Sequence, residues 1–514
     1  MVGNVTKKPE FDLLRAVADT IMLLVEALSS LEPQAVNYLS FHVEKYNISK
    51  DELDQGRLAA TKSSPVMEAI EACLEDGKLS LESMGQVMPR LLSVIRKGVG
   101  FPSKAASARV CMLLTELYPN QTMIYSQQLM QALSGAVQDP SSALLRKVMA
   151  LALAKVSSLA SQSAVEKLLQ HIRKLYTDSV IGGLEDTKRN VFFFFFSTNT
   201  FIEIEIGHEV GPMVAVELVR SIRGPVRDCA RTIVPVAFIG SFDETETFGN
   251  SWSEVLDETA SGKQQAIQGH FVGIVDIIEQ AIASPSWPWR KQAASALTAL
   301  ATLTSNPCLS FFFFFNFKYL DSELLATQTE RLCKMLVVAL TGPTYPGKET
   351  LVSSLVSLVK GAGTSFRQSN AVLEVMLQEV RKKDINYRRV VLDGICKLFD
   401  MPEFTASAHI DFATFDSLSS TALDTITKQM EVLDLVGAAA AAAAADVDDA
   451  RERPVRLLLV ANSLRLLGLV WPKGAQESAL PADATAQRFT AYTANLRDST
   501  VWRYKLWFMV HNTN

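Results

Sequence analysis

The pattern closest to known chemistry is GPTYPGK at residues 342–348, which matches a phosphate-binding loop up to its lysine. In such a loop backbone amides hold the phosphate, and a Ser or Thr after the lysine binds magnesium. Here Glu349 follows Lys348, and its carboxylate would repel phosphate. Other turns of the chain also carry proline and glycine, so we interpret this segment as a turn. An ATP-using enzyme that depends on Lys348 is the alternative.

The histidines, serines and cysteines do not form a pattern typical of a catalytic or metal site. His208 and Glu209 lack the later histidine of a zinc-protease helix, and no serine lies in a G-x-S-x-G turn. We therefore predict no enzyme activity, no catalytic residue, no cofactor and no metal. The six cysteines are far apart, which indicates reduced, packed thiols and a cytoplasmic protein, with the nucleus as a second location.

Aromatic and arginine residues at three of the turns are candidates for a partner-binding ridge. Tryptophan, tyrosine and arginine contribute a large share of the binding energy at protein interfaces. Packing between neighbouring turns explains the same residues about as well. The candidate residues are Trp287, Trp289, Arg290, Tyr345 and Arg388.

The densest group of basic residues lies at 381–389, where the sequence is RKKDINYRR. This segment falls at a turn between two predicted helices. Short basic runs are weak evidence for a binding site, so we interpret the segment as a solvated turn. A site for phosphate or for an acidic partner is the alternative.

The elements that must position these residues are helices that repeat as a unit. Residues 88–156 contain twice an apolar helical pattern, a break with proline, and a second helical pattern that opens with basic residues. Leu91 and Ile95 share one face, because residues four apart lie one above the other on a helix. The step from Pro102 to Pro140 is 38 residues. A period of roughly 33–47 residues is typical of stacked helical hairpins.

Polar residues near the breaks are expected to join neighbouring hairpins. Asp139 can cap the amide groups of the helix that follows it, and Arg146 or Lys147 can reach an acidic partner on the next hairpin. This combination indicates HEAT-type repeats. We predict an all-α fold, an α-solenoid of HEAT/armadillo-type helical hairpins. The basic residue that opens the second helix recurs at Lys104, Arg290, Lys348 and Arg388.

Composition excludes two classes of partner. The chain has 514 residues, 48% of them hydrophobic, with a formal net charge of −5. Nucleic acids and anionic membranes bind clustered Lys and Arg, so we expect no nucleic-acid partner. The apolar stretch at 457–471 is shorter than the ~20 residues that a membrane-spanning helix needs, and we expect no direct membrane insertion.

We expect four parts along the chain. A helical lead-in precedes a HEAT-repeat array that contains aberrant inserts, and a low-complexity linker separates that array from a terminal helical pair of the same kind. Ser49 followed by Glu52 predicts a capping box within the lead-in. The expected bounds are 1–60 for the lead-in, 61–402 for the array, 191–212 and 310–320 for the inserts, 403–450 for the linker and 451–514 for the terminal pair.

Phenylalanine runs at 191–196 and 311–315 interrupt the helical pattern. Our hypothesis is that both segments are translated intron ends, because phenylalanine codons are rich in pyrimidines. Tolerated apolar inserts are the alternative. Sequencing the mature transcript would decide between them, and finding both segments in it would contradict the hypothesis.

Particular stretches of the sequence resemble the family of large HEAT-repeat proteasome adaptor and scaffold proteins, in its C-terminal portion. The resemblance covers about residues 64–509 with interruptions. It rests on SPVMEAIEACL from Ser64, MPRLLSVIRKGVGFPSKAA from Met88, SAVEKLLQ from Ser163, IVPVAFIG from Ile233, WRKQA from Trp289, PGKETL from Pro346 and LLGLVWPKGAQ from Leu466.

The resemblance implies a non-enzymatic protein that binds the proteasome. Such a protein would contact core and regulatory particle subunits and would stabilise or monitor the association of the two particles. Family members are several times longer than this chain. An importin-type nuclear transport receptor, or another HEAT-repeat scaffold, is the alternative from the same architecture.

Overall fold

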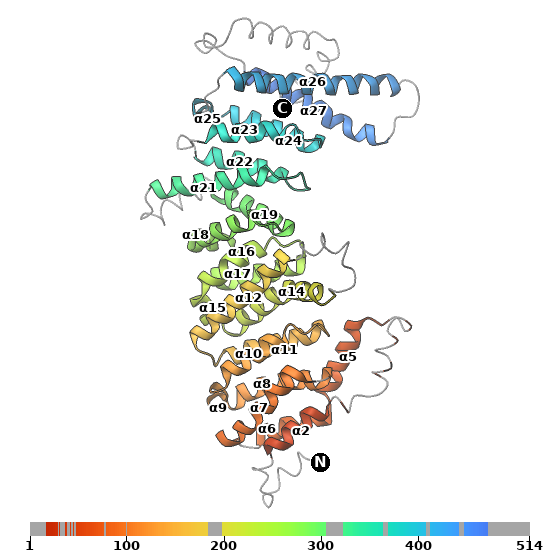
Figure 1. The fold of residues 1–514 in the computed structure, drawn as a ribbon, viewed down its shortest axis with the longest axis vertical. Coiled ribbons are helices and arrows are strands. Elements are labelled where there is room, and N and C mark those ends of the chain that lie inside the picture. Colours follow the sequence, from red (N-terminus) through yellow and green to blue (C-terminus); the bar gives the residue numbers. More distant parts are fainter. Residues whose placement is uncertain are drawn as a thin grey trace, which may run out of the picture. The chain divides into compact units, whose positions relative to one another are not determined.

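The computed structural model describes residues 17–182, apart from short gaps within 29–47 and at 77–78 and 99, and residues 198–304, 322–362, 368–407, 412–440 and 447–470. Within these ranges every regular element is a helix (Figure 1). The all-α prediction is therefore confirmed. The chain divides into two compact units, one of residues 1–277 and 283–292 and one of residues 278–282 and 293–514. This division falls inside the array expected at 61–402, and the expected domain bounds stay predictions.

Unit 1 consists of short and medium helices that follow one another as hairpins. Its helices are α2 (Val17–Ala27), α5 (Lys50–Lys62), α6 (Pro65–Asp76), α7 (Leu81–Lys97), α8 (Phe101–Leu117), α9 (Pro119–Met123), α10 (Ser126–Ala136), α11 (Ala143–Ser157), α12 (Gln162–Gly182), α14 (Thr198–Ser221), α15 (Arg223–Asp228), α16 (Ala230–Gly240) and α17 (Glu246–Ala260). The division between the units falls within α18 (Lys263–Ile282) and α19 (Trp287–Thr304).

The hairpins of unit 1 stack so that each helix contacts its partner and the equivalent helix of the next hairpin. The second helices α8, α11, α14 and α17 contact one another in chain order, and α10 packs on both α7 and α11. Leu91 and Ile95 are buried in α7, as the helical spacing predicts. The apolar side chains stabilise this stacking by roughly 25 cal/mol for each Å² that they remove from water. Stacking of this kind confirms the HEAT-type prediction.

Unit 2 repeats the same plan. Its helices are α21 (Ser322–Leu340), α22 (Glu349–Ala362), α23 (Ser369–Glu379), α24 (Ile385–Phe399), α25 (Pro402–Ser407), α26 (Phe412–Ala440) and α27 (Val447–Val470). The hairpin pairs are α21 with α22, α23 with α24, and α26 with α27. The second helices α22, α24 and α27 contact one another in order, so this unit is also a stack of hairpins.

Local sequence explains where several helices begin. The capping box at Ser49 is confirmed, because Glu52 N donates to Ser49 Oγ at 3.1 Å and Ser49 N donates to Glu52 Oε2 at 2.8 Å. The prediction that Asp139 caps the next helix is wrong. Ser142 caps α11 by accepting from Leu145 N, whereas Asp139 accepts from Ser141 N in the preceding turn.

Residues 198–212, which belong to the insert expected at 191–212, form the first half of α14. Val210 is buried in this helix, and Glu209 forms an ion pair with Arg146 at 2.5 Å. A Cβ atom added at Gly211 would lie 2.9 Å from Cβ of Tyr176, so the glycine lets α14 approach α12 closely. This stretch is therefore an integral part of the stack.

Residues 412–440, which belong to the linker expected at 403–450, form the 29-residue helix α26. Leu418, Ala422 and Ile426 are buried, and α26 packs along α27. Their spacing of four places them on one helical face, which the abundance of Ser and Thr obscured. The phenylalanine runs, the insert expected at 310–320 and residues 471–514 of the expected terminal pair lie outside the described residues.

Candidate functional site

The GPTYPGK turn holds a buried lysine instead of an open phosphate site. Lys348 is fully buried, and its Nζ donates to Glu379 Oε2 at 2.6 Å and to the carbonyl oxygen of Gly342 at 2.8 Å. Glu379 is itself 2% exposed. A phosphate could reach the amine only if this buried pair opened, so the turn has no geometry for nucleotide binding.

A third residue completes this cluster, which we name the Lys348 node: Lys348, Glu379 and Tyr387. The Tyr387 hydroxyl donates to Glu379 Oε2 at 2.7 Å, and Lys348 Nζ lies 5.3 Å from the centre of the Tyr387 ring. Burial lowers the pKa of Lys348, although the bond to Glu379 acts in the opposite direction. Burial also raises the pKa of the Tyr387 hydroxyl. The node joins the starts of α22 and α24 to the end of α23.

A second buried cluster, which we name the Asp243 node, lies in unit 1 and consists of Tyr176, His208, Asp243 and Gln292. The Asp243 side chain is 2% exposed, and it lies in the turn between α16 and α17. Its Oδ2 accepts from Tyr176 Oη at 2.7 Å and from Gln292 Nε2 at 2.7 Å, and it lies 2.6 Å from His208 Nε2.

The Asp243 carboxylate is held in its ionised form. Burial alone would raise its pKa, but the hydrogen bonds from His208 and Tyr176 outweigh burial, so the pKa of Asp243 lies below its ordinary value. Trp252 and Trp289 enclose the cluster, with ring centres 5.1 Å and 6.1 Å from that of Tyr176. The node joins α12, α14 and α19 to one turn. Sequence reasoning missed it, although Asp139 marks the equivalent turn of an earlier hairpin.

Three of the predicted ridge residues belong to unit 1. Trp287 and Arg290 are half-buried, and the Arg290 guanidinium lies 5.4 Å from the centre of the Trp287 ring, within range of a cation–π interaction. Trp289 is only 1% exposed, so its ring belongs to the core around Tyr176 and is not part of a surface.

The other two ridge residues belong to unit 2. Tyr345 is half-buried, and so is Arg388, whose Nη2 donates to Thr425 Oγ1 on α26 at 3.1 Å. Since Trp289 is buried, the five residues do not all lie at the surface. A partner-binding role for Trp287, Arg290, Tyr345 and Arg388 stays a prediction.

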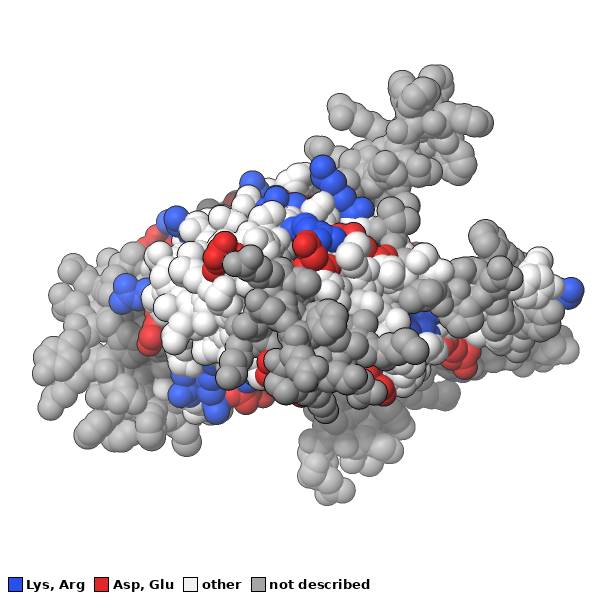
Figure 2. Space-filling model, turned by 90° about the horizontal axis from the view of Figure 1, so that it is seen from below, with Lys and Arg blue, Asp and Glu red and all other residues white. Residues whose placement is uncertain are grey.

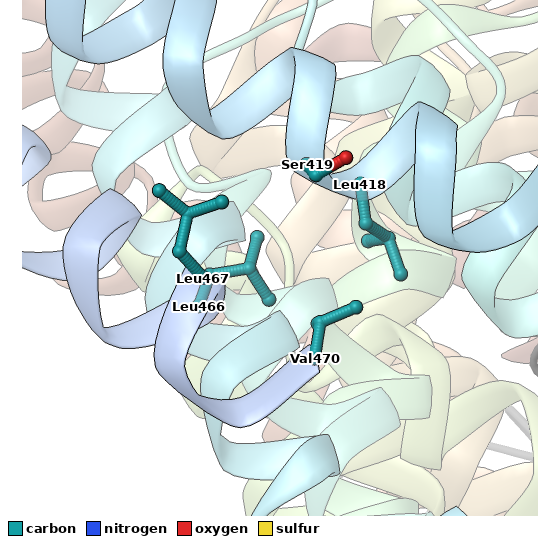
Figure 3. Close-up of a pocket in the computed structure, with 5 residues that line it drawn as sticks. All are labelled: Leu418, Ser419, Leu466, Leu467 and Val470. Carbon is teal, nitrogen blue, oxygen red and sulfur yellow. The ribbon is translucent and has the colours of Figure 1, made fainter. Parts of the chain in front are cut away.

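A small pocket lies between α26 and α27 (Figure 3). Leu418 and Ser419 line it from α26, and the remaining lining residues come from α27. Its lining contains no charged group, and the Ser419 hydroxyl donates to the carbonyl oxygen of Asp416 within its own helix. A binding site for a small molecule needs several converging polar groups, and this pocket lacks them. The lining residues on α27 are Leu466, Leu467 and Val470.

Reactive groups are scarce in the part of the chain that the structure describes. Five cysteines there are free and buried, and burial raises the pKa of the Cys111 thiol to about 12. A thiol with so high a pKa is a poor nucleophile, because the thiolate is the reactive form. Within the same residues no three His, Cys, Asp or Glu side chains gather as metal ligands, and no helix is long and apolar enough to cross a membrane.

Acidic and basic side chains are interspersed on the face that Figure 2 shows, and neither sign covers a large area of it. Several charged side chains of unit 1 pair across neighbouring helices. Arg220 of α14 bonds to Glu254 of α17 through two nitrogens, at 2.6 and 2.8 Å. Arg109 of α8 bonds to Glu71 of α6 at 2.9 Å. Such a surface gives no general field for a polyanion.

The comparisons with known proteins agree with this architecture. Residues 13–177 match the family model for the HEAT-repeat domain of the proteasome adapter and scaffold protein ECM29. The human proteasome adapter and scaffold protein ECM29 is 27% identical to this chain over 474 residues, which cover 89% of this chain and 22% of that protein. The Saccharomyces cerevisiae proteasome component ECM29 is 23% identical over 72% of this chain and 18% of its own length.

A third relative shows a similar identity and coverage. The proteasome-associated protein ECM29 homolog of Drosophila melanogaster is 23% identical over 75% of this chain and 18% of its own length. The chain thus spans about a fifth of the length of these relatives. The resemblance to the large HEAT-repeat proteasome scaffold family is confirmed, and the relatives' names do not favour the importin-type alternative.

Among solved structures, Kap121p bound to Nup53p covers 96% of this chain, with 13% identity and a TM-score of 0.36. Kap121p bound to RanGTP covers 98% of this chain, with 12% identity and a TM-score of 0.35. Both TM-scores are too low to support an argument about fold or partner.

Proposed function

We propose, from the similarity to ECM29 proteins over 89% of its length, that this chain is a non-enzymatic scaffold that binds the proteasome. In this role it contacts subunits of the core particle and the regulatory particle, and it stabilises or monitors their association. The observation that carries the proposal is this extended similarity to proteins named as proteasome adapters and scaffolds.

The architecture suits a scaffold. Each hairpin contacts mainly its neighbours, so a stack offers a broad surface to a large partner without needing a central cleft. The two buried nodes are consistent with a structural role, because their polar atoms bond to one another and hold hairpins in register. We place the protein in the cytoplasm, with the nucleus as a second location.

Affinity purification of the tagged 514-residue chain, followed by mass spectrometry, tests the proposal. Subunits of both proteasome particles are expected to be enriched. Enrichment of a small GTPase without proteasome subunits would instead support a transport receptor and would contradict the proposal, as would recovery of the chain alone.

A pair of matched variants tests whether proteasome binding depends on the packing of the stacked hairpins. Ala150 is fully buried in α11 and lies where α11 meets its neighbours. Ala150→Asp buries an unpaired carboxylate there, so we expect a lower melting temperature and reduced recovery of proteasome subunits. Leu151→Asp is the control, because Leu151 is 38% exposed on the same helix. Equal losses in the two variants would show that packing of α11 does not determine binding.

A further inference from the structure

The turn after α23 and the first turns of α24 carry five basic side chains, which we name the Arg381 patch. Arg381 and Lys383 are exposed, and the other three members are half-buried. All five lie within nine consecutive residues at one end of a hairpin of unit 2. The patch consists of Arg381, Lys382, Lys383, Arg388 and Arg389.

Three of the four basic residues that open the second helix of other hairpins are paired with carboxylates, whereas Arg290 lies against the Trp287 ring. Lys104 bonds to Asp139, Arg146 bonds to Glu209 at 2.5 Å, and Lys348 bonds to Glu379 at 2.6 Å. In each case the acidic residue lies on a later hairpin or turn of the same unit. These pairs show what a basic residue at this repeat position ordinarily contacts.

Arg388 occupies the same position but has a different environment. Its Nη2 donates to the hydroxyl of Thr425, and its Nε has no acceptor. Burial lowers the pKa of Arg388, and no neighbouring charge acts in the opposite direction. A half-buried guanidinium without a counter-charge is stabilised when an anion binds beside it.

The acidic residues nearest in sequence are already engaged. Both oxygens of Glu379 face cations, with Lys348 on Oε2 and Lys382 3.7 Å from Oε1. Asp384 caps α24 by accepting from Tyr387 N at 2.8 Å. Within the described part of unit 2, Arg381, Lys383, Arg388 and Arg389 form no ion pair, so the patch keeps a net positive charge.

We propose that the Arg381 patch binds an acidic segment of a partner protein. Arginine fits this occupant, because its planar fork donates two parallel hydrogen bonds to one carboxylate. A nucleic acid is less suited to the patch, since single strands bind by stacking bases on aromatic rings. Tyr387, the aromatic residue within the segment, is 3% exposed. The proposal rests on the proposed scaffold function, for which it names a surface and the chemistry of its partner.

Fluorescence anisotropy with a fluorescein-labelled poly-glutamate peptide tests the proposal on the full chain. The unsubstituted protein is expected to bind the peptide, and binding is expected to weaken as salt screens the charges. The variant Arg381→Glu with Lys383→Glu changes exposed residues and is expected to weaken binding about tenfold, since it replaces several attractions by repulsions. Arg388→Gln is expected to weaken it about threefold, because one ion pair is lost.

The matched control is Lys334→Glu with Lys360→Glu, which changes the net charge equally at exposed sites elsewhere in unit 2. It is expected to bind the peptide as the unsubstituted protein does. The proposal is overturned if the unsubstituted protein does not bind poly-glutamate or if the control loses affinity equally. It is also overturned if poly-uridine RNA or phosphatidylserine vesicles bind more tightly at the same salt concentration. If the unsubstituted protein recovers proteasome subunits but does not bind the peptide, only the proposed binding site is contradicted. If it binds the peptide but recovers no proteasome subunits, only the proposed function is contradicted.

Discussion

The Asp243 node of unit 1 and the Lys348 node of unit 2 both stabilise a buried carboxylate, but they do so with different donors. Each holds a buried carboxylate that accepts from a tyrosine hydroxyl, at 2.7 Å in both cases. In the Lys348 node the second donor is a fully buried ammonium group, whereas in the Asp243 node the donors include a glutamine amide and a histidine that is 28% exposed. One node is therefore a closed ion pair, and the other is an ionised carboxylate held by several hydrogen bonds, with its histidine partly exposed to solvent.

The difference shows what each unit depends on. A buried ion pair is costly to break, because removing one partner leaves the other charge without water or a counter-ion. A cage of several donors loses less when one contact is removed, since the remaining donors still satisfy the carboxylate. We expect unit 2 to be more sensitive than unit 1 to substitutions in its node.

The largest expected effect is that of Lys348→Met. It should lower the free energy of unfolding by about 3–5 kcal/mol, because Glu379 loses its buried cation and keeps only the partly exposed Lys382 at 3.7 Å. Urea denaturation followed by circular dichroism measures the change. The double variant Lys348→Met with Glu379→Leu is the control, and it should recover most of the loss, since an apolar pair replaces the ion pair. If the double variant were as unstable as the single one, the ion pair would not explain the loss.

Asp243→Ala should have the next largest effect, about 2–3 kcal/mol, because it leaves Gln292 Nε2 and the Tyr176 hydroxyl without their common acceptor. The same denaturation experiment measures it. Asp243→Asn keeps one oxygen acceptor and should lose less. A loss from Asp243→Ala that exceeded the loss from Lys348→Met would reverse the comparison between the two nodes.

Acid should weaken the Asp243 node. The pKa of Asp243 is lowered from its ordinary value of 3.8, since hydrogen bonds from His208 and Tyr176 outweigh the effect of burial. The ionised carboxylate therefore stabilises the fold at pH values above 3.8, and this stabilisation is lost as the pH falls through the lower pKa of the folded state.

Melting temperatures of the unsubstituted chain and of Asp243→Asn, measured as the pH is lowered through this range, test that sign. The difference in melting temperature between the two proteins should narrow as the pH falls. The same comparison can be made in the double variant Lys348→Met with Glu379→Leu, which keeps Asp243. The difference in melting temperature between this variant and the same variant with Asp243→Asn should also narrow as the pH falls. A gap that stayed constant would mean that the ionised form of Asp243 contributes nothing to stability.

The sequence predicted the hairpins and some of the links between them. Apolar spacing placed α7 and α11, and a basic residue after a turn predicted the bond from Arg146 to an acidic residue of a later hairpin. The Asp243 node was not predictable in this way. It brings together Tyr176, Asp243 and Gln292 from three hairpins, and no sequence spacing encodes which side chains of stacked helices meet.

Two other segments differ from what their composition alone suggests. Composition suggested a linker at 403–450, yet one apolar stripe was enough to bury α26 against α27. The turn at 342–348 resembled a nucleotide loop because glycine and proline serve tight turns of either kind. Its lysine proved to be an internal counter-ion for Glu379, which lies on the following hairpin.

The smallest expected effect is that of an exposed pair, which isolates the contribution of burial. Arg220 and Glu254 are 52% and 38% exposed, and their bonds of 2.6 and 2.8 Å are as short as those in the nodes. Glu254→Ala should nonetheless cost less than about 1 kcal/mol, because water solvates the Arg220 guanidinium, which also keeps its bond to Glu217. Raising the salt concentration should reduce even that difference. If Glu254→Ala destabilised the protein as much as Lys348→Met in the same urea experiment, bond geometry and not burial would set the strength of these contacts.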